Sequence, residues 1–136
     1  MKKYLLVVTI VICLLLSGCV TSNQATVDVL ETCKVIGSTI TETSISENKD
    51  YFTITFENGL FYCEDKTNVF TVYTIKIPND CEFDMYSIIK SIASNITEEN
   101  FNKLETDGEV SFYKAHRENW RLYKSTEGNT VKYVIK

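Results

Sequence analysis

Histidine, proline and glycine are scarce in this sequence of 136 residues, which has one histidine, one proline and five glycines. The sequence contains no Cys-x-x-Cys motif, and no carboxylate pair lies at ligand spacing from the single histidine, His116. Both observations argue against a zinc site. The glycines beyond the opening segment are Gly37, Gly59, Gly108 and Gly128. Each fits a helix end or a turn, so none is left for a phosphate-binding loop, and we expect no metal and no cofactor.

The motifs of nucleophilic catalysis are also missing. Ser111 and Ser125 lie near His116, but there is no Gly-x-Ser-x-Gly elbow. The expected strand pairing brings no acid, base and oxyanion-binding group together. A catalytic pair of carboxylates, as in glycosidases, stays an open alternative, because the two residues of such a pair can be far apart in the sequence. The sequence therefore favours binding over catalysis.

Basic residues are fewer than acidic ones, and the balance changes along the chain. Residues 20–108 hold six Lys and Arg against 15 Asp and Glu, whereas residues 109–136 hold six against three. An acidic body has no overall attraction to nucleic acid, so we expect no nucleic-acid partner. The last part of the chain is its only basic surface.

A long apolar run is lacking too. The strongly apolar stretch over residues 5–16 has 12 residues. At about 1.5 Å per residue it spans roughly 18 Å, well short of the ~30 Å hydrocarbon core of a bilayer. It follows Met1-Lys2-Lys3, and a cationic start before a short apolar run is typical of an export signal.

The residues that close this run, Leu16-Ser17-Gly18-Cys19, resemble the lipobox of bacterial lipoproteins. The resemblance covers residues 1–20 and implies cleavage between Gly18 and Cys19, with a diacylglyceryl group on the Cys19 thiol. Two or three acyl chains make such an anchor stable. The protein would then be lipid-anchored and extracytoplasmic, at the bacterial cell membrane or outer membrane. The alternatives are a plain signal peptide or a spanning helix in which Cys19 is incidental.

Three segments and an α+β fold are predicted for the whole chain. Residues 1–18 form the signal peptide, residues 19–25 the lipidated cysteine and tether, and residues 26–136 a single α+β domain with a mostly antiparallel sheet. The expected order is a helix, a four-stranded meander, a long helix plus a short helix, and a three-stranded meander. The helices are expected over 26–36, from a cap at Asp80 to Ile96, and over 97–105, and the strands over 38–46, 51–56, 61–64, 69–77, 110–115, 119–124 and 130–135.

Asn58-Gly59 predicts a tight hairpin, because a two-residue type I′ turn needs positive φ at both positions. Such a turn pairs Phe56 with Phe61 and Ile54 with Cys63. These four side chains and that of Phe52 would then all lie on one face of the sheet.

Three cysteines remain once Cys13 is removed with the signal and Cys19 is lipidated. A strand after Cys63 would carry the chain roughly 23 Å away before Cys81, at about 3.3 Å per residue. A disulfide needs Cα atoms within about 7 Å, which argues against a Cys63–Cys81 bridge. Cys33 lies just before the first strand and is expected at the same end of the sheet as Cys81. We therefore predict a Cys33–Cys81 bridge with Cys63 buried and free. Three unpaired thiols are the alternative.

One candidate binding face stands out in the basic part of the chain. With a turn at 117–118, Lys114 pairs near Arg121 and Phe112 near Tyr123, with Lys132 alongside and all five opposite the core. Basic groups interleaved with aromatic rings can hold an anionic polymer, a sugar or an acidic partner. The alternatives are an ordinary solvated face or a face buried by another sheet.

The resulting functional expectation is a lipid-anchored envelope protein that binds rather than catalyses. Its partners would be the membrane, through the lipid on Cys19, and a protein or envelope polymer. A small envelope enzyme acting on cell wall or lipid is the competing hypothesis. An immunity or exclusion factor fits the size of the chain, but no residue supports it.

Overall fold

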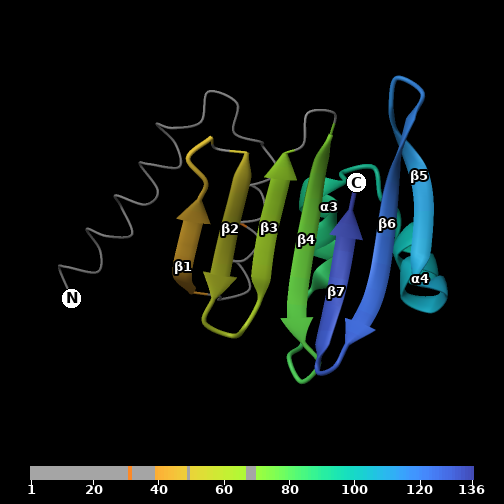
Figure 1. The fold of residues 1–136 in the computed structure, drawn as a ribbon. Coiled ribbons are helices and arrows are strands. Elements are labelled where there is room, and N and C mark those ends of the chain that lie inside the picture. Colours follow the sequence, from red (N-terminus) through yellow and green to blue (C-terminus); the bar gives the residue numbers. More distant parts are fainter. Residues whose placement is uncertain (1–30, 32–38, 49, 67–69) are drawn as a thin grey trace.

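A computed structural model describes residues 31, 39–48, 50–66 and 70–136 of the chain. Seven strands form one antiparallel sheet in the order β1-β2-β3-β4-β7-β6-β5 (Figure 1). The strands are β1 (Ile40–Ile45), β2 (Tyr51–Phe56), β3 (Phe61–Lys66), β4 (Thr71–Pro78), β5 (Glu109–Ala115), β6 (Glu118–Glu127) and β7 (Thr130–Ile135). Between β4 and β5 the chain forms α3 (Met85–Ile92) and α4 (Glu98–Asp107). Figure 1 shows α3 and α4 on the same side of the sheet.

This architecture corrects the predicted α+β arrangement. The four-stranded and the three-stranded meander form one seven-stranded sheet, because β4 pairs with β7 along six residue pairs. The long helix is also wrong: α3 has eight residues and α4 has ten. The N-cap of α3 is Asp84, whose carboxylate accepts from the Ser87 amide, and not Asp80. Apart from Glu31, which is helical, the helix predicted over 26–36 lies outside the described residues.

The predicted signal peptide, Cys19 and the tether also lie outside the described residues. Their assignment stays a prediction.

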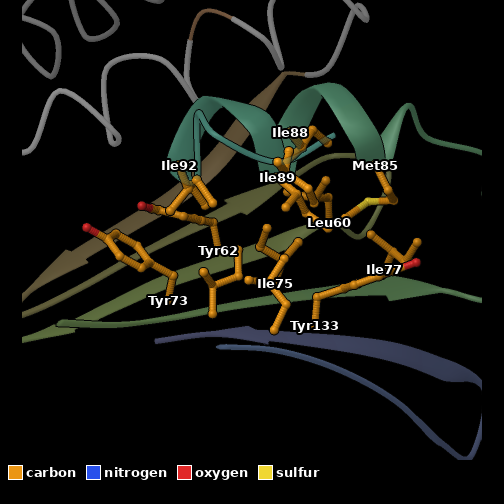
Figure 2. Close-up of a cluster of buried hydrophobic side chains, with 14 of the residues drawn as sticks. Leu60, Tyr62, Tyr73, Ile75, Ile77, Met85, Ile88, Ile89, Ile92 and Tyr133 are labelled. Carbon is orange, nitrogen blue, oxygen red and sulfur yellow. The ribbon is translucent and has the colours of Figure 1, made fainter. Parts of the chain in front are cut away.

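The core lies between α3 and the middle of the sheet. One side of α3 is apolar, with Met85, Ile88, Ile89 and Ile92 all buried. Figure 2 shows these side chains directed toward buried residues of the sheet, among them Leu60, Tyr62, Ile75, Ile77 and Tyr133. Burying apolar surface in this way is the main favourable term in folding, so this layer holds the helix on the sheet.

The β2–β3 hairpin forms as predicted, but its register is wrong by one residue. Thr55 pairs with Phe61, where Phe56 was expected to pair with it. The loop has three residues, because the Phe56 amide donates to the Leu60 carbonyl at 2.8 Å and the Gly59 amide to the Phe56 carbonyl at 2.9 Å. A three-residue loop that ends in a residue of positive φ is the next common hairpin connection after the two-residue one.

Burial explains why the longer loop is preferred. The shift directs Leu60 and Tyr62 into the core, where both side chains are fully buried. It moves Phe61 and Cys63 to the opposite face, since a slip of one residue inverts every side chain of a strand. Gly59 has φ of +88°, and a Cβ there would lie 2.8 Å from Cγ of Pro78. Glycine is therefore required at this position for two independent reasons.

A polar contact fixes α4 against β6 and β7. The Tyr133 hydroxyl donates to Oε1 of Glu105 at 2.7 Å, and the Lys124 ammonium is paired with Oε2 of the same carboxylate. Burial, reinforced by the Glu105 carboxylate, raises the pKa of Tyr133 well above its usual range. At the end of α4, Gly108 adopts φ of +80° and turns the chain into β5. These contacts place β5 beside β6.

Candidate binding face

The face of the sheet opposite α3 and α4 carries basic and aromatic side chains from β3, β4, β6 and β7. Phe61 is aligned with Lys76, and Lys76 with Lys132. Arg121 and Lys136 exchange both backbone hydrogen bonds, at 2.7 and 3.0 Å. Because side chains at paired positions point to the same face of a sheet, these residues share one surface. We call it the outer face and define it by Phe61, Lys76, Arg121, Tyr123, Lys132 and Lys136.

Strand alternation explains how the sequence produces this surface. Ile75 and Ile77 flank Lys76, Leu122 separates Arg121 from Tyr123, and Tyr133 and Ile135 alternate with Lys132 and Lys136. All five intervening apolar residues are buried on the helix side. Since successive side chains of a strand point to opposite faces, burying one set commits the other set to the outer face.

The cations of the outer face lie close to its aromatic rings. The Lys76 ammonium is 5.8 Å from the centre of the Phe61 ring, and the Lys136 ammonium is 4.9 Å from the centre of the Tyr123 ring. Such contacts are worth about 0.5–1 kcal/mol at exposed sites. They hold the ammonium groups near the face without neutralising them, so the charge stays available to an anion.

The electrostatic balance of this region differs from that of the whole chain. Over β4–β7 the outer face has four cations, on Lys76, Arg121, Lys132 and Lys136, and two carboxylates. One carboxylate, Glu127, forms an exposed ion pair with Lys132 at 3.2 Å. The other, Glu109, is aligned with Tyr123. These strands therefore carry two excess positive charges on the outer face, whereas the same face of β1 and β3 carries the carboxylates of Glu42 and Asp65.

Three of the five predicted binding residues lie on the outer face, and two do not. Arg121, Tyr123 and Lys132 are brought together there. Phe112 instead pairs with Trp120 and packs against the core. Lys114 lies with its ammonium 4.2 Å from the centre of the Trp120 ring, so it covers a core residue and does not join Arg121.

A bulge in β5, next to the turn between β5 and β6, accounts for this difference. The chain turns at His116 and Arg117, which have φ of 50° and 68°, and a bulge shifts the register between Tyr113 and Ala115. Positive φ is uncommon for residues other than glycine, and the turn was predicted one residue later, at 117–118. The earlier turn shifts each pairing by two residues and keeps the facing, whereas the bulge inverts the expected facing of β5. Tyr113 is exposed, whereas it was predicted on the core side.

Sequence reasoning missed Phe61, Lys76 and Lys136. Lys136 could have been found from alternation along β7, because it continues the series of Lys132 and Val134. Phe61 depends on the hairpin register, and Lys76 joins the face only because β4 pairs with β7. Neither fact is encoded in a local pattern.

The two cysteines that the structure describes, Cys63 and Cys81, add no further site. Cys63 is buried with a free thiol, and the Cys81 thiol is free and donates to the carbonyl of Asn58 at 3.4 Å. Desolvation raises the pKa of both thiols, at Cys81 with help from the carboxylate of Asp80. Cys33 lies outside the described residues, so the Cys33–Cys81 bridge stays a prediction.

Within residues 31, 39–48, 50–66 and 70–136, no group of three or more His, Cys, Asp or Glu is arranged to hold a metal ion. None of the helices in this same part of the chain is long and apolar enough to cross a membrane.

Comparison with known proteins gives no relative for this chain. No family model matches the sequence, and neither the curated proteins nor the solved structures contain a match.

Proposed function

We propose that this protein is a lipid-anchored, non-catalytic protein of the bacterial envelope whose outer face binds an anionic component of that envelope. The observation that carries the binding role is the alignment of Lys76, Arg121, Lys132 and Lys136 on one sheet face with Phe61 and Tyr123 between them. The lipobox Leu16-Ser17-Gly18-Cys19 supports the anchor.

The side-chain chemistry favours an anion over other ligands. Ammonium and guanidinium groups form their strongest hydrogen bonds with phosphate and carboxylate oxygens. Arg121 and Lys136 are adjacent and exposed, so both can meet one charged group from solvent. Tyr123 beside them offers an aromatic surface for the uncharged part of the same ligand.

Reversing the charge of Arg121 and Lys136 tests the binding role. The Arg121→Glu/Lys136→Glu variant is expected to bind long-chain polyphosphate at least about tenfold more weakly than the unaltered chain, because favourable charges become repulsive. Binding by the unaltered chain should also weaken as salt is raised, since exposed charges are screened. Both effects can be measured by fluorescence titration of the lipidated chain in detergent.

The matched control is Lys90→Glu/Lys103→Glu, which makes the same change in net charge on exposed positions of α3 and α4. It should bind polyphosphate nearly as well as the unaltered chain, apart from a small long-range effect. Equal losses in the two variants would show that only net charge matters and would refute a binding site on the outer face.

The anchor is tested by Cys19→Ser. This variant is expected to lose incorporation of a fatty-acid analogue completely, because serine cannot form the thioether to the diacylglyceryl group. Cys13→Ser, a change of the same kind within the apolar run, should keep full incorporation. Metabolic labelling followed by intact-mass measurement reads out both. Labelling of the Cys19→Ser chain, or none of the unaltered chain, would overturn the lipid anchor.

A further inference from the structure

Three aromatic side chains are exposed at one end of the sheet. Tyr51 begins β2, Phe70 directly precedes β4, and Tyr113 is near the end of β5, with exposed fractions of 43%, 52% and 63%. The antiparallel order brings the start of β2, the start of β4 and the end of β5 to the same end, where the C-terminus also lies (Figure 1). We call this group the aromatic end.

The aromatic end belongs to the outer face. Tyr51 is aligned with Asp65, and Asp65 with Val72, which is two residues from Phe70. Ser111, two residues before Tyr113, is aligned with Arg121. Since residues two apart share a face of a strand, all three rings lie on the side that carries Arg121 and Lys136.

The spacing of these rings indicates a wide and flat partner. β2 and β5 are five steps apart in the sheet, which is about 24 Å at ~4.8 Å per step. No small ligand reaches across that distance, whereas a planar surface meets all three rings at once. Between the outermost rings, Lys136 and Arg121 add two cations against one carboxylate, that of Asp65, which is aligned with Tyr51.

From this geometry we infer that the aromatic end docks onto an anionic lipid bilayer, with its rings among the headgroups and the two cations on lipid phosphates. Aromatic side chains with a polar edge suit the membrane interface, and basic residues nearby attract anionic lipid. This inference rests on the proposed function, because it names the anionic component that the outer face binds.

The anchor makes such a contact favourable. Twenty residues separate Cys19 from Ile40, and a chain of that length spans at most about 70 Å. The lipid on Cys19 would therefore keep the domain within reach of the bilayer. Because the domain is tethered, its effective concentration at the bilayer surface is high, and even a weak contact with the bilayer is then formed.

Quenching by brominated lipids locates the contact. Tryptophan is placed at position 113 (Tyr113→Trp) or on the helix side (Lys103→Trp), each in a lipidated full-length chain with Trp120→Phe. In vesicles of phosphatidylcholine and phosphatidylglycerol, quenching at position 113 should exceed that at position 103 by about twofold or more. The difference should shrink in vesicles of phosphatidylcholine alone.

Hydrogen exchange on the unaltered chain gives a second test that needs no substitution. Anionic vesicles should slow exchange over residues 111–121 relative to detergent, while residues 98–107 change little. Equal quenching at both positions together with unchanged exchange would overturn membrane docking. If polyphosphate still binds the outer face in that case, the ligand is a soluble polyanion and the proposed function survives. If polyphosphate also fails to bind, both proposals fall.

Discussion

Replacing Ile89 by alanine is expected to lower the free energy of unfolding by about 2–5 kcal/mol, the usual cost of removing a large buried aliphatic side chain. Ile89 is fully buried, and Figure 2 shows it between α3 and the sheet. The cost has two parts, because burial of the removed carbons is lost and a cavity stays where neighbours cannot collapse. Urea unfolding followed by circular dichroism measures the change.

Ile45→Ala is the matched control, since it removes the same atoms from a side chain that is 52% exposed at the end of β1. Its effect should stay within about 0.5 kcal/mol, as for most surface substitutions. A loss at Ile89 no larger than that at Ile45 would mean that α3 does not pack on the sheet as described.

Local patterns predict the strands of this protein better than they predict how the strands are joined. The hairpin at Asn58-Gly59 was found because turn chemistry is local, although its register depended on burying Leu60. The pairing of β4 with β7 joins residues about 60 positions apart, such as Tyr73 and Ile135. Both strands alternate apolar and polar residues in a way that suits many partners, so alternation cannot select this pairing.

In the candidate site, too, residues in regular strands were predicted correctly, and residues whose position depends on an irregularity were not. Arg121, Tyr123 and Lys132 were placed correctly because β6 and β7 alternate regularly and meet in a short turn that contains Gly128. Phe112 and Lys114 were misplaced because one bulged residue inverts the remainder of a strand. The packing of Phe112 against the core outweighs the local preference against positive φ at His116 and Arg117.

Stability is expected to fall steeply above pH 10 because two buried tyrosines resist ionisation. Burial, with a smaller contribution from Glu64, raises the pKa of Tyr73 to about 12, and burial together with Glu105 raises the pKa of Tyr133 further. In the unfolded chain both phenols lose their protons near pH 10, whereas the folded chain retains them. The unfolded state then binds fewer protons, so each tyrosine lowers the free energy of unfolding by up to about 1.4 kcal/mol per pH unit.

Phenylalanine substitutions separate this effect from general alkaline denaturation. Tyr133→Phe loses the hydrogen bond to Glu105 and should be about 1 kcal/mol less stable at pH 7, yet its stability should fall less steeply above pH 10. Tyr73→Phe should also flatten the slope, and the double variant should flatten it most.

Tyr113→Phe provides the control, because this ring is 63% exposed and the substitution should leave the slope unchanged. Burial also raises the pKa of Cys63, but that thiol is present in every variant and adds the same slope to each. Urea unfolding at pH 8 to 11.5 measures the slopes. If the double variant loses stability as steeply as the unaltered chain, the two hydroxyls are not held protonated by the fold, and the burial of Tyr73 and Tyr133 beneath the helices is wrong.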